Sequence, residues 1–362
     1  MIFTTLKTIK ARCRIKVDLQ PQVEQIIKDT VVVDAHLDLL KDVLYLRNSG
    51  KTRVIETDYL PEFKRGGIDV VVSSLYVDAE YLPEMALRCA LDQISCLYLE
   101  LEESPDQIAL CRNREDINAA LIEGKIAILL SFEGVEPLGS DLYLLPVFYE
   151  LGLRIIGLTW SRMNYAAQGS RFYPEKSGCE GGVTDFGVKV LEFAMKNHML
   201  VDVSHINDQG FWDVLDFYQG PVIASHSNCR HLVDIPRNLS DDMIRAIADT
   251  GGVVGINAIN FLAAQSDDNA NTHVLVDHID HIAELVGTDH IGFGFDQCKR
   301  IDRKNTSVDV KKLKKAPFDI LSDYSEVREL VGIMISRGYT LQDIKKICGG
   351  NFLRVFDTLM PG

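Results

Sequence analysis

The chain has 362 residues, of which 46% are hydrophobic and 25% are charged, so it is long enough to bury one large globular core. Its formal net charge of −14 and its sequence pI of about 5.1 argue against nucleic acid and against a membrane surface as partners, because both are anionic and attract basic proteins. Single α/β barrels commonly reach this length. We therefore predict one domain over residues 1–362.

The cysteines and the hydrophobic runs favour a reducing, aqueous compartment. Eight cysteines are scattered along the chain without a CxxC pair, which is typical of reduced structural thiols rather than of a thiolate metal site. The first twenty residues lack the apolar run and cleavage site of a secretory signal, and no run elsewhere approaches about 18 apolar residues. The sequence therefore predicts a cytoplasmic protein.

Eight short apolar runs, rich in β-branched residues, predict buried parallel strands. In chain order they are residues 31–34, 70–76, 126–132, 155–158, 200–203, 222–224, 253–256 and 291–295. Segments with helical periodicity lie among them, as βαβ crossovers require, at residues 83–103, 186–197, 241–249 and 274–286. Eight strands alternating with helices predict the α/β class and a (β/α)8 TIM barrel.

The remaining segments complete this barrel. Two further helices are expected over residues 323–338 and 341–360, covering the outside or the base, with Gly349 and Gly350 bending the second of them. Residues 161–182 and 299–315 are interpreted as long loops after the fourth and eighth strands. Such loops build the active-site face of a barrel.

Three histidines and three carboxylates stand directly at the ends of the predicted strands: His36, Asp38, Glu133, His205, His226 and Asp296. Singly, each of them is more often a helix cap or a hydrogen-bonded polar residue. Because strand ends converge at one face of a barrel, the six should meet there. Their number exceeds the needs of one tetrahedral zinc ion, so the sequence predicts two divalent metals, with zinc as the first choice.

Ligand counting divides the set between two ions. His36 and Asp38 are two residues apart in extended chain and can share one ion, His205 and His226 hold the other, and Glu133 bridges them with its two oxygens. A water between ions about 3.5–4 Å apart becomes hydroxide at neutral pH, and the ions polarise the attacked carbonyl. The predicted activity is hydrolysis. Asp296, which is left over from the metal ligands, would move the proton to the leaving group.

Eight segments of the sequence resemble the membrane dipeptidases, a family that comprises renal dipeptidase and its bacterial relatives. The segments are DAHLDL at 34–39, SFEG at 131–134, LTWSRMN at 158–164, VDVSHI at 201–206, VIASHS at 222–227, RNLSDD at 237–242, HIGFGFD at 290–296 and NFLRVFD at 351–357. The resemblance runs nearly end to end. It implies a metal-dependent amidohydrolase-like barrel, two zinc ions on the five ligands named above, and a small dipeptide as substrate, with a D-residue at the carboxyl end as one candidate.

The resemblance also implies roles around the metals. Arg237 would bind the free carboxylate of the dipeptide through its guanidinium fork, and Asp296 would handle the proton; from the residues alone, Arg237 is a surface residue near a helix start. Trp160 stands where family members often have a histidine that stabilises the oxyanion, and its indole N–H offers one uncharged donor. Asn257 follows the seventh strand and is a candidate substrate contact, with a loop hydrogen bond as the alternative.

The leading hypothesis is a binuclear zinc dipeptidase, and two alternatives stay open. One is a related amidohydrolase acting on another small amide, an N-acyl amino acid or a lactam, which Trp160 and the loop at 161–182 suggest. The other is a catalytically inactive metal-binding protein.

A homodimer is compatible with such a barrel. The other histidines are interpreted as structural or exposed: His198, His231, His273, His278, His281 and His290.

Overall fold

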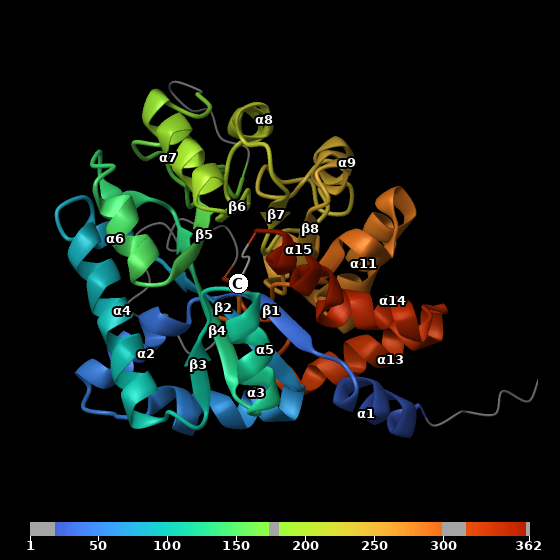
Figure 1. Cartoon of the computed structure of the whole chain (residues 1–362). Coiled ribbons are helices and arrows are strands. Elements are labelled where there is room, and N and C mark those ends of the chain that lie inside the picture. The colour runs from blue at the N-terminus through green and yellow to red at the C-terminus, as the bar shows by residue number, and fades with distance from the viewer. Residues whose placement is uncertain (1–18, 174–180, 299–315, 360–362) are drawn as a thin grey trace, which may run out of the picture.

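The computed structural model describes residues 19–173, 181–298 and 316–359 of the chain. A ring of parallel strands occupies the centre, and helices surround it (Figure 1). The predicted loop at 299–315 and part of the loop at 161–182 lie outside the described residues, as does the last residue of the predicted helix 341–360. Within the described part, the chain forms one closed barrel with its connecting helices.

Among the described residues, nine strands form the sheet, and all nine pair in parallel. They are β1 (Val32–Leu37), β2 (Ile68–Leu75), β3 (Ile108–Leu110), β4 (Ile126–Glu133), β5 (Leu153–Gly157), β6 (Leu200–Asp202), β7 (Val222–Ala224), β8 (Val253–Ile256) and β9 (Ile291–Phe293). The order runs β2-β1-β9-β8-β7-β6-β5-β4-β3, and pairing of β2 with β4 closes eight of them into a barrel. The prediction of a (β/α)8 barrel is confirmed.

The ninth strand was not predicted. β3 pairs only with the first three residues of β4, from Ile126 to Ile128, while β5 pairs with the later part of β4 from Leu130 onward. β3 therefore lies outside the closed ring. It has three residues, of which only Ile108 is fully buried, so its sequence carries too little apolar pattern to distinguish it from a loop.

Helices connect successive strands and cover the barrel. The α-helices are α1 (Gln20–Lys28), α2 (Leu39–Asn48), α3 (Leu60–Gly66), α4 (Ala86–Glu103), α5 (Arg114–Ile122), α6 (Leu144–Glu150), α7 (Asp185–Lys196), α8 (Asp208–Phe217), α9 (Asp241–Asp249), α10 (Asn260–Ala263), α11 (Thr272–Val286), α13 (Val327–Arg337), α14 (Leu341–Lys345) and α15 (Asn351–Leu359). Shorter 3-10 or π-helical turns are η1 (Ile55–Tyr59), η2 (Ala79–Tyr81), η3 (Glu136–Leu138), η4 (Asp267–Asn269), η5 (Thr288–His290), η7 (Tyr324–Glu326) and η8 (Lys346–Gly350).

The predicted helices are present with small shifts at their ends. Ser240 caps α9, and its hydroxyl accepts a hydrogen bond from the Met243 N–H, which stabilises the first turn. The predicted last helix is two helices joined by the π-helical η8, which contains both glycines. A Cβ atom at Gly349 would stand 2.3 Å from the Val31 carbonyl oxygen, so glycine is needed where η8 approaches the start of β1.

Alternate residues of the strands pack into two separate apolar layers. Val33 and Val70 belong to an inner cluster that also contains Phe352 and Phe356 of α15. The intervening residues, such as Val32, pack outward against the helices. Because both faces of the strands are buried, the strand sequences are mostly apolar, and most of their polar residues lie near the strand ends, with Asp34 in the middle of β1 as an exception.

Candidate metal centre

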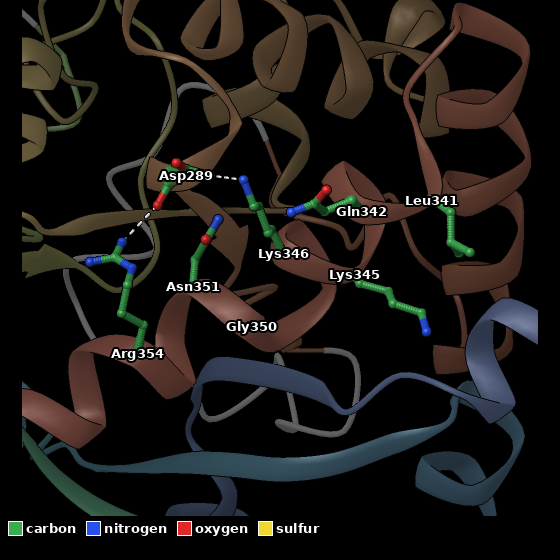
Figure 2. Close-up of a pocket in the computed structure, with 8 residues that line it drawn as sticks. All are labelled: Asp289, Leu341, Gln342, Lys345, Lys346, Gly350, Asn351 and Arg354. Carbon is green, nitrogen blue, oxygen red and sulfur yellow. Dashed lines mark hydrogen bonds and ion pairs between the residues drawn. The ribbon is translucent and has the colours of Figure 1, made fainter.

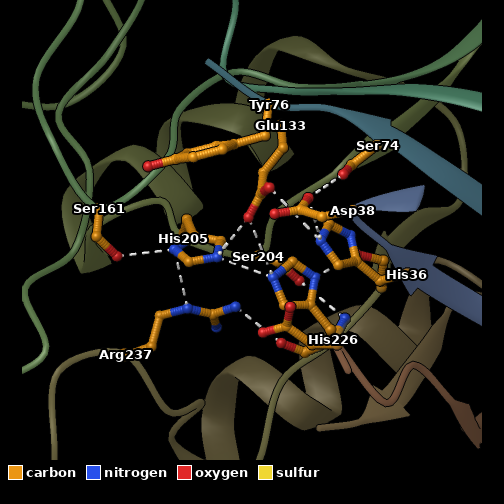
Figure 3. Close-up of polar contacts among 12 residues, drawn as sticks. His36, Asp38, Ser74, Tyr76, Glu133, Ser161, Ser204, His205, His226 and Arg237 are labelled. Carbon is orange, nitrogen blue, oxygen red and sulfur yellow. Dashed lines mark hydrogen bonds and ion pairs between the residues drawn. The ribbon is translucent and has the colours of Figure 1, made fainter. Parts of the chain in front are cut away.

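The predicted ligands meet at the carboxyl ends of the barrel strands (Figure 3). His36 is the penultimate residue of β1, Asp38 follows β1, and Glu133 is the final residue of β4. His205 and His226 stand in the turns just after β6 and β7. Four of these five side chains are at most 7% exposed, and Asp38 is 14% exposed. Strands far apart in sequence thus bring three imidazoles and two carboxylates together, as the sequence predicts.

Glu133 stands between the other four side chains. Its Oε2 lies 3.5 Å from His36 Nε2, which is in turn 3.9 Å from an oxygen of Asp38. Its Oε1 lies 3.0 Å from His205 Nε2 and 3.6 Å from His226 Nε2. One oxygen therefore faces each of the two ligand pairs that counting from the sequence proposes, and each group of three is compact enough to hold one ion.

Imidazole nitrogens converge on the centre of the site, and those of His36 have no hydrogen-bond partner there. Nε2 of His205 and Nε2 of His226 are 2.8 Å apart, and the rings of His36 and His226 stack with centroids 3.6 Å apart. Both ring nitrogens of His36 are buried without a hydrogen-bond partner, although buried polar atoms normally have one. Lone pairs that converge in this way fit a divalent cation.

Electrostatics in the cluster also favour a cation. Burial raises the pKa of Glu133, and the neighbouring Asp38 raises it further. Burial opposes the charged form of His36, but the carboxylate of Glu133 reverses this effect and raises the pKa of His36. Burial lowers the pKa of His205 and of His226 well below the usual value, which keeps both rings in the neutral form that binds metals. The residues present therefore fit a site for divalent metals.

A chain of hydrogen bonds orients His226. Its Nδ1 lies 2.7 Å from the hydroxyl of Ser225, and that hydroxyl donates to a carboxylate oxygen of Asp202. Because the hydroxyl proton goes to Asp202, the hydroxyl oxygen accepts the Nδ1 proton, and Nε2 keeps its lone pair free toward Glu133. Asp202 is fixed by the Ser204 and Ser225 N–H groups, both at 2.9 Å.

Arg237 lies inside the site rather than on the surface. Its side chain is 3% exposed and donates to His205 Nδ1 at 3.1 Å, to the Ser227 hydroxyl at 2.8 Å and to the His226 carbonyl at 2.8 Å. Burial lowers the pKa of Arg237 to about 10, which still leaves the group charged at neutral pH. The surface interpretation is therefore wrong, because the loop after β7 folds back over the strand ends.

Asp296 is held beside the ligands by Asn257. The Asn257 amide nitrogen donates to Asp296 Oδ2 at 3.0 Å, and the Asn257 amide oxygen accepts the Ile259 N–H at 2.7 Å. The second bond fixes the orientation of the amide, so its donor faces Asp296. Burial raises the pKa of Asp296 to about 6, which suits a group that exchanges protons near neutrality. The loop hydrogen bond considered for Asn257 is present.

Trp160 forms part of an aromatic wall on one side of the site. Its ring stacks on His205 with centroids 5.7 Å apart and meets Phe172 edge to face at 5.5 Å. The guanidinium of Arg162 lies over the Trp160 ring at 5.1 Å and over Tyr76 at 5.4 Å, while its Nε donates to Glu136 at 2.7 Å. The Arg162 guanidinium thus packs on the aromatic rings of Trp160 and Tyr76.

Several residues near the centre were missed by sequence reasoning. Asp202 and Ser225 flank predicted ligands within their motifs, so their position after strands was the available signal. Asp34 accepts the Phe295 N–H at 2.9 Å and the Tyr324 hydroxyl at 2.6 Å, which ties β1 to the segment after β9 and to η7. Nothing local predicts the Tyr324 contact, because 290 positions separate the two residues.

Two of the site residues have a strained backbone. His205 has φ of 67° and Asp296 has φ of 57°, and they are two of four non-glycine residues with positive φ in the described part of the chain. Residues other than glycine rarely have a positive φ, and strained residues of this kind are frequent at functional sites.

A cavity of about 600 Å³ lies at the other end of the barrel (Figure 2). It is lined by Asp289, Leu341, Gln342, Lys345, Lys346, Gly350, Asn351 and Arg354. Asp289 and Asn351 lie next to the start of β9, so this cavity is at the amino ends of the strands. None of the predicted ligands lines it.

Among the described segments, no helix combines the length and the apolar character that crossing a bilayer requires.

The fold and the buried cluster define a class of protein, a hydrolase-like barrel with room for metal ions at the strand ends. A family model described as membrane dipeptidase (Peptidase family M19) matches residues 20–360. The chain therefore belongs to the membrane dipeptidase family, a family of metallopeptidases, and the predicted resemblance is confirmed.

Individual relatives agree with this assignment. An uncharacterised protein from the PQQ-III 3′ region of Acinetobacter calcoaceticus is 36% identical over 49% of this chain and 58% of its own length. Dipeptidase 3 of Mus musculus is 31% identical over 64% of this chain and 44% of its own length. The match to these two proteins thus spans about half of their lengths.

Solved structures show the same fold. The dipeptidase AC, a metallopeptidase of family M19, is 25% identical, with a TM-score of 0.78, and the match covers 92% of this chain and 99% of that one. A metallopeptidase from Rhodobacter sphaeroides, solved with a phosphinate mimic of the dipeptide L-Ala-D-Ala, is 24% identical, with a TM-score of 0.79 and coverage of 91% and 100%. The single domain, the cytoplasmic location and the homodimer stay predictions.

Proposed function

We propose that this protein is a metal-dependent dipeptidase that hydrolyses the peptide bond of small dipeptides at a binuclear zinc centre. The observation that carries the proposal is the position of Glu133, with one carboxylate oxygen toward His36 and the other toward His205 and His226. A carboxylate in that position can bridge two ions. Family membership and the dipeptide mimic bound by the Rhodobacter protein support the substrate class, including a D-residue at the carboxyl end.

Five residues would hold the ions: His36, Asp38, Glu133, His205 and His226. When bound, the ions would supply Lewis acidity and an activated water as the nucleophile. Asp296, whose pKa is raised to about 6, would carry the proton from that water to the leaving amine. Asn257 would keep the Asp296 carboxylate in position through the 3.0 Å hydrogen bond.

Arg237 would bind the carboxylate of the dipeptide. A guanidinium nitrogen only donates, so its 3.1 Å contact requires an unprotonated His205 Nδ1. A neutral His205 that binds metal through Nε2 must instead carry its proton on Nδ1, where the Ser161 hydroxyl at 2.7 Å can accept it. Metal ligation by His205 therefore competes with the Arg237 contact and leaves the Nε–H of Arg237 free for a substrate carboxylate, while the other two guanidinium nitrogens keep their bonds to Ser227 and the His226 carbonyl.

The aromatic wall supports a second candidate function. Trp160 and Phe172 present apolar faces beside His205, and apolar pockets select bulky acyl groups over small amino-acid side chains. The second candidate is therefore hydrolysis of another small amide, an N-acyl amino acid or a lactam. In either reaction, the Trp160 indole N–H would be the uncharged donor for the oxyanion.

A comparison of substrates and a bridge variant test the proposal. The zinc-loaded protein is assayed against dipeptides, including those with D-residues at the carboxyl end, and against N-acyl amino acids and lactams. Turnover of dipeptides is expected, and turnover of only the other amides would replace the proposal with the second candidate. Tight zinc binding without any hydrolysis would indicate an inactive metal-binding protein.

Glu133→Gln is expected to lower both zinc content and activity, the latter about 1000-fold or more. One bridging carboxylate oxygen is replaced by an amide NH2 group, which cannot coordinate a metal ion. Metal analysis after dialysis and initial rates measure the two effects. Glu123→Gln, at a side chain that is 56% exposed, is the matched control and should behave like wild type. Full activity of Glu133→Gln would contradict the bridging role.

A further inference from the structure

A second group of metal-binding side chains lies outside the barrel mouth. His231 belongs to the loop between β7 and α9, Asp241 is the first residue of α9, and His281 lies in α11. Helices α9 and α11 are neighbours on the outside of the barrel (Figure 1). One ligand atom from each of the three residues lies within 4.8 Å of the other two.

The two imidazoles stack on each other beside the Asp241 carboxylate. Their rings are nearly parallel, at 9°, with centroids 4.6 Å apart, and His281 Nε2 lies 2.8 Å from Asp241 Oδ1. The His281 and Asp241 side chains are 14% and 35% exposed, and His231 is exposed, so the group is accessible from solvent. The nearby Arg230 is paired with Asp208 at 2.7 Å and 2.8 Å, which offsets its positive charge.

We propose that His231, Asp241 and His281 form a further site for one divalent transition-metal ion of the zinc type. Two imidazole nitrogens and one carboxylate oxygen are the donor set that zinc prefers, whereas calcium and magnesium prefer oxygen ligands alone. Three protein ligands leave one tetrahedral position for water. This site lies apart from the barrel centre and shares no ligand with it.

A metal ion at this site would brace the loop that carries Arg237. The loop is pinned near its ends, where Arg230 N–H donates to the Leu239 carbonyl at 2.7 Å and Leu239 N–H donates to the Asn228 carbonyl at 2.9 Å. His231 and Asp241 lie just inside and just beyond this stem, and His281 belongs to a separate helix. An ion held by all three therefore ties both arms of the loop to α11, and the barrel site gains a structural support that depends on metal supply.

The test uses the full chain with Zn²⁺ as the probe. Bound zinc is measured by elemental analysis after equilibration with a zinc buffer, for wild type, His281→Ala and Asp241→Asn. Each variant is expected to bind one equivalent fewer than wild type. His273→Ala, at an exposed histidine of α11 outside the proposed site, is the control and should bind as much as wild type. Unchanged zinc content in both site variants would overturn the proposal.

Repeating the measurement in the Glu133→Gln background separates this site from the barrel centre. Glu133→Gln alone should retain the outer ion, and adding His281→Ala should remove it. Hydrogen exchange of residues 228–241 reports the bracing: zinc should slow it about 10-fold or more in Glu133→Gln and leave it unchanged in the double variant. Loss of one equivalent without any change in exchange would overturn the bracing role.

Discussion

The two ends of the barrel use similar polar residues for different purposes. At the carboxyl ends of the strands, both ring nitrogens of His36 are buried without hydrogen-bond partners, and His205 and Asp296 have a strained backbone. At the amino ends, Asn351 donates to the carbonyls of Thr288 and Ile291, at 2.7 Å and 2.8 Å. The His36 ring nitrogens at the carboxyl end therefore lack protein partners, while the Asn351 amide at the amino end is paired with backbone carbonyls.

This difference indicates where a ligand contributes to the structure. An unpaired buried polar atom costs about 1–3 kcal/mol, so a cluster of such atoms persists where a ligand can offset the cost. Paired polar groups at the base stabilise the fold with no ligand at all. Variants at the carboxyl end should therefore change catalysis or metal binding, and variants at the base should change the free energy of unfolding.

Among the variants expected to keep wild-type zinc content, Asp296→Asn should have the largest effect at the carboxyl end. An amide cannot accept the proton that Asp296 is proposed to carry, so kcat should fall about 100-fold to 10,000-fold, while zinc content stays at the wild-type value. Initial rates at saturating dipeptide and metal analysis measure the two quantities. The asparagine keeps the shape of the side chain, so a normal kcat would contradict the role of Asp296 in proton transfer.

The sequence predicted that the proposed ligands would meet because their positions depend on one rule. Polar residues that directly follow buried parallel strands must converge at one face of a barrel, so Glu133 and His226 could be grouped without knowing the loops. Arg237 could not be placed in this way, because it lies 13 residues beyond β7, in a loop whose return path depends on tertiary contacts. The family resemblance, rather than any local pattern, assigned it to the site.

Arg237→Lys should have the next largest effect. Lysine keeps the charge but loses the planar fork, so KM for dipeptides should rise about 10-fold to 100-fold, with a smaller change in kcat. Arg245→Lys is the control, because Arg245 is 49% exposed and pairs only with Asp242 among the described contacts. A KM equal to that of wild type would show that the substrate carboxylate is bound elsewhere.

Ser225→Ala tests how the protein orients a ligand. Without the hydroxyl, Nδ1 of His226 loses its acceptor and the ring is no longer held in one tautomer, so zinc affinity should fall about 10-fold to 100-fold. Competition with a chelator measures the affinity. Ser336→Ala removes a hydroxyl that bonds a helix carbonyl in α13 and should leave zinc affinity unchanged.

The contacts that sequence could not predict join distant segments. The Tyr324 hydroxyl of η7 bonds Asp34 of β1 across 290 positions, and pairing of β2 with β4 depends on closure of the whole ring. In the sequence, β3 lies between β2 and β4, and its three residues are too few to show a strand pattern. Periodicity records which face of an element is buried, whereas these contacts depend on where each element lies relative to the others.

The smallest effect on activity is expected at the base, from Asn351→Ala. The substitution leaves the Thr288 and Ile291 carbonyls without their side-chain donor, so the free energy of unfolding should fall by about 1–3 kcal/mol. Because the amino ends of the strands do not contact the site, kcat and KM of the folded protein should stay within about twofold of wild type. Denaturant unfolding and steady-state rates measure the two effects, with the exposed Gln342→Ala in the same cavity as control. A large loss of kcat with unchanged stability would break the comparison, because polar groups at the base would then serve catalysis as well as folding.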